Sequence, residues 1–115
     1  MLPKQYRLKK RSAFAATYRT GKSLHKNGVT LFIGKAKDNQ QPAKVGFVVS
    51  KKIHKRAVKR NRIKRLMRES YRLLIKSDRV KNKYMSLIFV ASSKLLNKDF
   101  TYIDTAIQDL VGKLW

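Results

Sequence analysis

Hydrophobic and polar positions follow two different periods along the chain, and these periods predict its helices and strands. Residues 12–21 are typical of a short helix, because Ser12 can cap the free N–H groups and Gly21 can adopt the left-handed conformation. Asn27-Gly28 is a two-residue hairpin signal, since both residues tolerate positive φ. The pattern predicts strands at 23–26, 29–36, 43–50 and 84–91, a polar loop at 37–42 and a basic linker at 79–83.

A longer helix is predicted at residues 57–75, and its two sides differ in chemistry. At about 100° per residue, apolar side chains gather on one side and basic ones on the other. The apolar side holds Ile63, Leu66, Met67, Ser70, Leu73 and Leu74. The opposite side holds Arg60, Asn61, Lys64, Arg65, Arg68 and Arg72. One side is therefore expected to pack in the core, and the other is cationic.

A final helix is predicted to begin near Thr101, which with Asp104 three residues later resembles a capping box. Its buried stripe is expected to be Ile103, Ile107, Leu110, Val111 and Leu114. The strand at 84–91 is apolar on both faces, which indicates a central, covered strand. The order α-β-β-β-α-β-α describes one domain over residues 1–115, an α+β fold with a roughly four-stranded sheet packed by helices.

Composition narrows the possible classes of protein. The chain has 115 residues with 29 Lys and Arg against 6 Asp and Glu, a formal net charge of +23, yet 43% of its residues are hydrophobic. A disordered basic tail would contain fewer apolar residues, so we expect a folded domain that meets polyanions. The absence of cysteine excludes disulfides, thiolate zinc sites and cysteine nucleophiles.

The expected location is the cytoplasm. The longest apolar run, residues 87–91, is far shorter than the ~20 residues of a membrane span, and no secretory signal is visible. An acid-poor basic start can imitate a mitochondrial transit peptide, but the same segment reads as an ordinary capped helix.

The positive charge is concentrated in one segment. Residues 51–72 hold 11 Lys or Arg and one acid, Glu69. A run of a single sign on a rigid helix favours a phosphate-binding surface over a merely solvated one. Anionic lipid is disfavoured because the apolar helix side is needed for the core, and DNA because neither helix-turn-helix spacing nor zinc ligands are visible.

Aromatic residues near this charge favour RNA. Phe14 and Tyr18 are i, i+4 neighbours, and Phe32 lies on a strand face among small side chains. Such rings can stack on unpaired bases, although the alternative that the three rings simply pack together stays open. The six acids are scattered, and His25 and His54 have no catalytic partner at suitable spacing, so we expect binding without catalysis and no protein-bound metal.

The segment 51–69, with Arg60-Asn61-Arg62 at its centre, resembles the signature of the bacterial ribonuclease P protein subunit and its RNR motif. Many members carry a glycine near His54, where this chain has none. The resemblance extends over nearly the whole chain, including residues 6–10, Phe14 and residues 46–52.

The resemblance implies a function and a set of site residues. In this family the RNA subunit cleaves the 5′ leader from precursor tRNA with bound Mg²⁺, and the protein binds both RNAs. Catalytic-RNA contacts would be Lys51, Lys52, Lys55, Arg56, Arg60, Asn61, Arg62, Lys64, Arg65 and Arg68. The leader cleft would be Phe14, Tyr18 and Phe32.

The family fold also implies a left-handed βαβ crossover, a rare exception to the right-handed rule. Two other functions remain as alternatives: a ribosomal or ribosome-assembly protein, and a stand-alone nuclease.

Overall fold

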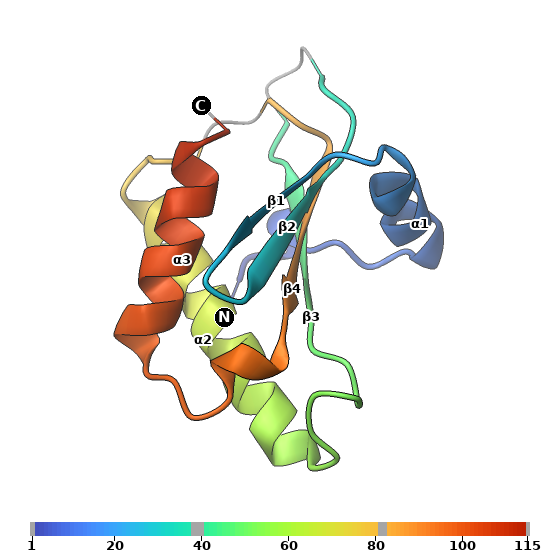
Figure 1. The fold of residues 1–115 in the computed structure, drawn as a ribbon. Coiled ribbons are helices and arrows are strands. Elements are labelled where there is room, and N and C mark those ends of the chain that lie inside the picture. Colours follow the sequence, from blue (N-terminus) through green and yellow to red (C-terminus); the bar gives the residue numbers. More distant parts are fainter. Residues whose placement is uncertain (1, 38–40, 81–82, 115) are drawn as a thin grey trace.

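A four-stranded sheet forms the centre of the structure, a computed structural model that describes residues 2–37, 41–80 and 83–114. The helices are α1 (Arg11–Arg19), α2 (Ala57–Lys76) and α3 (Phe100–Gly112), and the strands are β1 (Ser23–Lys26), β2 (Val29–Ile33), β3 (Lys44–Val48) and β4 (Ser86–Ala91). α1 lies on one face of the sheet, and α2 and α3 pack together on the other (Figure 1). This order confirms the predicted α+β class.

The strand order is β1-β2-β4-β3, which confirms that the strand predicted as central is central. β4 pairs antiparallel with β2 and parallel with β3. Asn27 (φ 48°) and Gly28 (φ 87°) form the predicted hairpin turn between β1 and β2. The predicted loop at 37–42 and linker at 79–83 lie partly outside the described residues. No helix in the described part of the chain has the length and apolar character of a membrane span.

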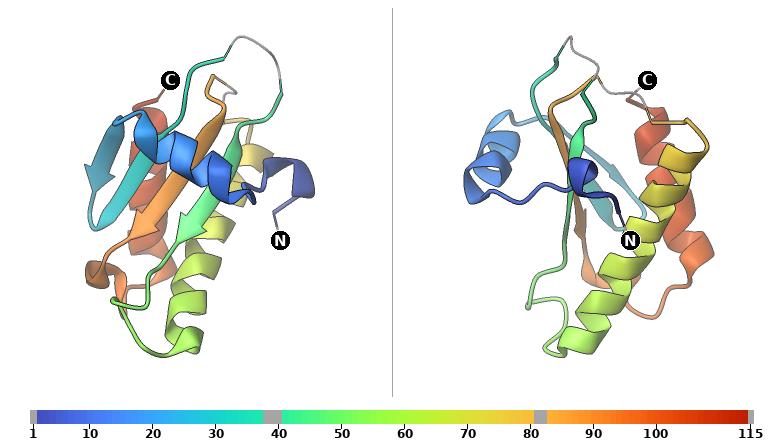
Figure 2. Two further views of the ribbon diagram at one scale, coloured as in Figure 1. Left: turned by 90° about the vertical axis from the view of Figure 1, so that its right-hand side faces the viewer. Right: turned by 180° about the vertical axis from the view of Figure 1, so that it is seen from behind.

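The connection from β3 through α2 to β4 is left-handed. In the left-hand view of Figure 2, β3 and β4 both point downward, with β3 on the right. The chain passes behind the sheet through α2 and returns to β4 on the left. About 98% of such connections are right-handed. The crossover implied by the family resemblance is therefore present.

The main core lies between the sheet and the α2–α3 layer. Ile63, Met67, Ser70 and Leu74 of the predicted apolar side of α2 are buried, and Leu66 is partly buried. Leu73 was predicted to be buried but is 39% exposed, and Tyr71 is buried instead.

The physical reason is aromatic packing. The Tyr71 ring lies 5.7 Å from Phe89 and 6.3 Å from Phe47, measured between centroids, which rotates the buried side of α2 toward Tyr71. The predicted stripe of α3 is buried except for Leu114, which packs at the margin of the core.

Two predicted helix caps are wrong. Lys10, not Ser12, is the N-cap residue of α1. The helix begins at Arg11, so Ser12 already lies within the first turn, and no side chain caps the helix. α3 begins at Phe100, where the Asp99 carboxylate accepts a hydrogen bond from Tyr102 N–H, so Thr101 and Asp104 form no capping box. Gly21 does adopt the predicted left-handed conformation, with φ 72°.

Candidate nucleic-acid interface

The cationic side of α2 points away from the core, as its amphipathic pattern predicts, because buried Ile63 and Met67 hold the opposite side. None of the ten residues that the family resemblance implies as contacts of the catalytic RNA is buried. Seven are exposed: Lys51, Lys52, Lys55, Arg56, Asn61, Arg62 and Arg65. Three are partly buried: Arg60, Lys64 and Arg68. Neither of the two ion pairs found among the described residues involves any of these ten.

Arg72 differs from its neighbours because it has an acidic partner. Its Nη2 and Nε donate to the two carboxylate oxygens of Glu69 at 2.7 and 3.0 Å. This hydrogen bond, together with the charge of Arg72, holds the pKa of Glu69 below its usual value against the opposing effect of burial. Arg72 was predicted on the cationic side, but its charge is thus compensated locally. Arg65 and Arg68 have no such partner among the described residues.

Two arginines of the Arg60-Asn61-Arg62 motif are held by main-chain carbonyls. Arg60 Nη1 donates to the carbonyls of His54 and Lys55 at 2.9 and 2.8 Å. Arg62 Nη2 donates to the carbonyl of Lys98, 2.8 Å away at the approach to α3. Each guanidinium keeps further N–H donors, so both forks are oriented and still able to bind phosphate. These tethers have no sequence signal, because any residue supplies a carbonyl.

The turn that leads into α2 is closed by His54. His54 Nδ1 accepts a hydrogen bond from the main-chain N–H of Arg56, the N-cap residue, at 3.0 Å. His54 is not among the residues with positive φ, so the backbone at this position does not require glycine. The imidazole therefore has a structural role at the start of the basic helix.

The predicted aromatic residues lie on the α1 side of the sheet but do not form one cluster. Tyr18 and Phe32 meet edge to face, with centroids 4.9 Å apart and planes at 78°. Tyr18 remains 40% exposed, and partial burial raises the pKa of its phenol. Phe14 lies instead against Gly46 of β3. The structure thus joins two of the three rings and separates the third.

Buried hydroxyl groups anchor α1 to the sheet. Thr17 Oγ1 lies 2.5 Å from Ser86 Oγ of β4 and also donates to the carbonyl of Ala13. Thr20 Oγ1 donates to the carbonyl of Ile33 at 2.6 Å. The sequence prediction missed these residues, although threonines at i, i+3 on the sheet-facing side were the available signal. The hydroxyl groups of Thr17 and Thr20 fix the position of α1 on the sheet, and with it the positions of Phe14 and Tyr18.

The acids of α3 have structural partners. Asp104 accepts from Ser70 Oγ and from Gln108 Nε2, both at 2.6 Å, and Asp109 forms an ion pair with Lys26 at 3.6 Å. Among the residues that the structure describes, no group of three His, Cys, Asp or Glu is placed to hold a metal ion. The acids of α3 are thus engaged locally, whereas the charges of α2 that have no ion-pair partner among the described residues are positive.

Comparison with known proteins agrees with this chemistry. Residues 2–115 match the family described as Ribonuclease P. The Ribonuclease P protein component of Clostridium kluyveri is 38% identical over 108 residues, covering 94% of this chain and 93% of the relative. The structure of the RNase P protein from Staphylococcus aureus has a TM-score of 0.75 at 27% identity, covering 99% and 92% of the two chains. The Thermotoga maritima RNase P protein shares the fold, with a TM-score of 0.77 at 23% identity over 93% and 96%.

Proposed function

This chain belongs to the ribonuclease P protein family, and we propose that it is the accessory subunit of a ribonucleoprotein that cleaves the 5′ leader from precursor tRNA. In this proposal the RNA subunit carries out the hydrolysis, and the protein binds both RNAs in the cytoplasm. The observation that carries the proposal is the set of α2 cations that have no acidic partner in the described structure. The family match does not favour a ribosomal protein, the alternative considered from composition alone.

The basic face of α2 and the turn before it would bind the catalytic RNA. Bringing unpaired cations onto a folded RNA releases condensed counterions, which is favourable and sequence-independent. Arg60 and Arg62, already oriented by carbonyls, would lose little side-chain freedom on binding. The proposed contacts are Lys51, Lys52, Lys55, Arg56, Arg60, Asn61, Arg62, Lys64, Arg65 and Arg68.

Asn61 would add hydrogen bonding without charge. It is exposed, and no hydrogen bond joins its side chain to another described residue. An amide can donate and accept at once, which suits a ribose hydroxyl or a base edge.

The single-stranded leader would lie on the α1 side of the sheet, against Phe14, Tyr18 and Phe32. The edge-to-face pair leaves Tyr18 40% exposed, so part of its ring is available to an unpaired base. Base–aromatic stacking contributes about 1–3 kcal/mol per base and tolerates any sequence. This supports a leader site that accepts many precursors.

Mg²⁺ would be bound by the RNA subunit and the substrate. The protein surface that meets the RNA in this proposal is cationic and would repel a divalent cation. Asp104 and Asp109 are engaged with neighbouring side chains on the α3 side of the molecule. The protein would lower the Mg²⁺ requirement by supplying positive charge that Mg²⁺ must otherwise provide.

Reconstitution tests the proposal. The purified protein is mixed with a bacterial ribonuclease P RNA, and cleavage of a 5′-labelled precursor tRNA is followed at low Mg²⁺. We expect the protein to restore cleavage that the RNA alone performs poorly, and to have no activity without the RNA. An unchanged rate would contradict the proposal. Cleavage by the protein alone, abolished by replacing an acidic residue, would instead support a stand-alone nuclease.

A further inference from the structure

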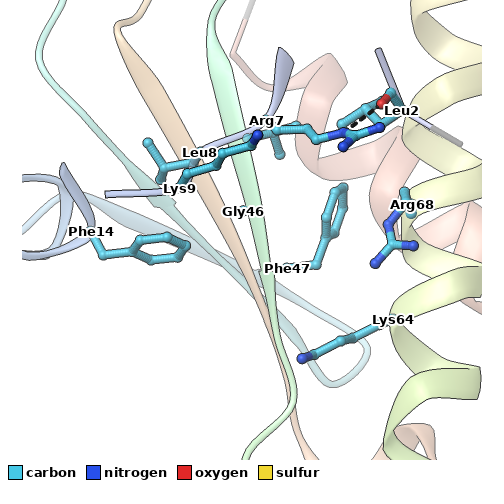
Figure 3. Close-up of a pocket in the computed structure, with 10 residues that line it drawn as sticks. Leu2, Arg7, Leu8, Lys9, Phe14, Gly46, Phe47, Lys64 and Arg68 are labelled. Carbon is cyan, nitrogen blue, oxygen red and sulfur yellow. Dashed lines mark hydrogen bonds between the residues drawn. The ribbon is translucent and has the colours of Figure 1, made fainter. Parts of the chain in front are cut away.

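A pocket of about 310 Å³ lies at the outer edge of β3, between the N-terminal segment and α2 (Figure 3). Its size is at the lower end of the ~300–1,000 Å³ of small-molecule sites. Four cations and two aromatic rings dominate its lining: Arg7, Lys9, Lys64, Arg68, Phe14 and Phe47. None of its lining residues is acidic. The pocket therefore combines positive charge with aromatic surface in a space suited to one small anionic ligand.

The main chain of β3 is open at this pocket. Lys44 N–H donates to the carbonyl of Met85 on the β4 side, whereas the carbonyl of Val45 accepts from Leu8 N–H on the outer side. Because main-chain direction alternates along a strand, the N–H and C=O of Phe47 also point outward. No main-chain or side-chain group of the described residues bonds them on that side. A donor and an acceptor thus stand together at the pocket.

The two rings are fixed on opposite sides of β3, as Figure 3 shows. Phe47 stacks on Phe89 with centroids 5.7 Å apart and planes at 11°. Phe14 lies so close to Gly46 that a Cβ at that position would come within 2.6 Å of Phe14 Cζ. Glycine at position 46 therefore allows the Phe14 ring to lie against the face of β3 opposite Phe47.

The cations surround the Phe47 side of the pocket. In Figure 3 the side chain of Arg7 passes above the Phe47 ring, Lys64 extends below it, and Arg68 lies beside it on α2. Arg7 Nε donates to the carbonyl of Leu2 at 2.7 Å, which orients the guanidinium and leaves its Nη groups for another acceptor. Neither ion pair of the described structure involves these cations, so their charge is available to a ligand.

We propose that this pocket binds one unpaired nucleotide of an RNA chain. The base edge pairs with the N–H and C=O of Phe47, its face contacts an aromatic ring, and its phosphate is bound by Arg7, Lys9 and Lys64. Each base offers an adjacent donor and acceptor on one of its edges, so the pocket accepts more than one base. A base-paired nucleotide does not fit, because the pocket requires that the pairing edge and one face of the base be free. The inference rests on the proposed function, since that function supplies the RNA.

Amide NMR of the whole ¹⁵N-labelled chain, titrated with adenosine 5′-monophosphate, tests the site directly. We expect saturable shifts of the Phe47 and Gly46 amides, and smaller shifts with adenosine, which lacks the phosphate. Lys9→Met should weaken binding of the nucleotide roughly two- to fivefold, the effect of an exposed charge pair. Lys10→Met is the matched control, because Lys10 is the adjacent exposed lysine and does not line the pocket.

A second variant tests the aromatic wall without changing charge. Gly46→Ala would displace the Phe14 ring and should also weaken nucleotide binding, with thermal unfolding measured to show that the variant is folded. If both Lys9→Met and a folded Gly46→Ala bind the nucleotide as the parent chain does, the assignment is wrong. Absence of Phe47 and Gly46 shifts at millimolar nucleotide would also overturn it.

Competition identifies the source of the nucleotide. A single-stranded trinucleotide should bind more tightly than the mononucleotide and displace it, as expected for a site that takes part of a chain. A mononucleotide that the trinucleotide does not displace would indicate a free-nucleotide site and overturn the assignment to RNA. Shifts at Phe47 with an extended acidic peptide, but not with the nucleotide, would indicate strand addition and would also overturn it.

The same preparation is assayed for cleavage of precursor tRNA with the RNA subunit. Stimulated cleavage together with unshifted Phe47 and Gly46 amides refutes the pocket but leaves the proposed function standing. Unstimulated cleavage refutes the proposed function, whatever the mononucleotide does.

Discussion

Replacing Arg65 with glutamine removes a charge that has no acidic partner, whereas replacing Arg72 removes one that Glu69 already compensates. The two arginines are on the same helix, two turns apart. If the unpaired charges of α2 bind RNA phosphates, the two substitutions must differ in the salt dependence of binding. Arg65→Gln should weaken binding and reduce the salt slope, and Arg72→Gln should change the slope much less.

The magnitude follows from counterion release. Each phosphate contact contributes about 0.9 to the slope of log K against log salt concentration on a duplex, and about 0.7 on a single strand. Between 50 and 200 mM salt, one duplex contact therefore accounts for roughly a 3.5-fold change in affinity. Arg65→Gln should remove one such contact, and the Arg65→Gln, Arg68→Gln double variant should remove two.

Filter binding or fluorescence anisotropy with ribonuclease P RNA, at four or more salt concentrations, measures the slope. Glu69→Gln is the reciprocal variant: it releases Arg72 from its partner, so it should tighten binding and steepen the slope by up to about one contact. Equal slopes for the parent, Arg65→Gln and Arg72→Gln proteins would refute the reasoning, because they would place α2 away from the RNA.

Three further predictions concern stability. Sulfate should raise the melting temperature at fixed ionic strength. The net charge of +23 opposes folding, and an anion that binds the clustered cations of the folded state stabilises that state. A melting temperature that does not change with sulfate would contradict this. Tyr71→Phe should stabilise the fold by about 1 kcal/mol, or ~4 °C in melting temperature, since the buried Tyr71 hydroxyl has no hydrogen-bond partner among the described residues. A lower melting temperature of the variant would contradict this prediction. Gly28→Ala should lower the free energy of unfolding in urea more than Gly21→Ala does. Both glycines have positive φ, but only at Gly28 would an added Cβ meet Lys94 and Ser92, each at 2.9 Å. Equal losses would show that the positive φ alone determines the effect.

Local chemistry made much of the fold predictable. Asn27-Gly28 identified the hairpin because its turn requires positive φ at both positions. The two sides of α2 followed from helical periodicity, and the apolar character of residues 84–91 indicated a central strand. In each case one residue type, or one period, is sufficient to select the structure.

Contacts between distant segments were not predictable in the same way. The burial of Tyr71 depends on Phe47 and Phe89, which reach it from two different strands. The helix caps were missed for a different reason: α3 begins at a local cap, Asp99, that the choice of Thr101 overlooked, and α1 begins at Arg11 with no side-chain cap at all. Local patterns contain no information about the distant partners of Tyr71.

The candidate site also combines features that the sequence could predict with features that it could not. Periodicity placed the cations on the outer side of α2, but it did not show which of them are compensated. The Glu69–Arg72 pair follows the i, i+3 rule and was available from sequence. The carbonyl tethers of Arg60 and Arg62 were not, because their acceptors are main-chain atoms. The position of Phe14 against Gly46 required the sheet itself.

The strand order has a consequence for synthesis of the chain on the ribosome. β4 is the last strand to be made, yet it lies between β2 and β3, which do not pair with each other. Until Ser86–Ala91 has emerged from the exit tunnel, β1–β2 is the only strand pair of this sheet that can form, and an isolated hairpin is marginally stable in water. The complete sheet can therefore assemble only when the final quarter of the chain is being made, after the basic segment has already left the ribosome.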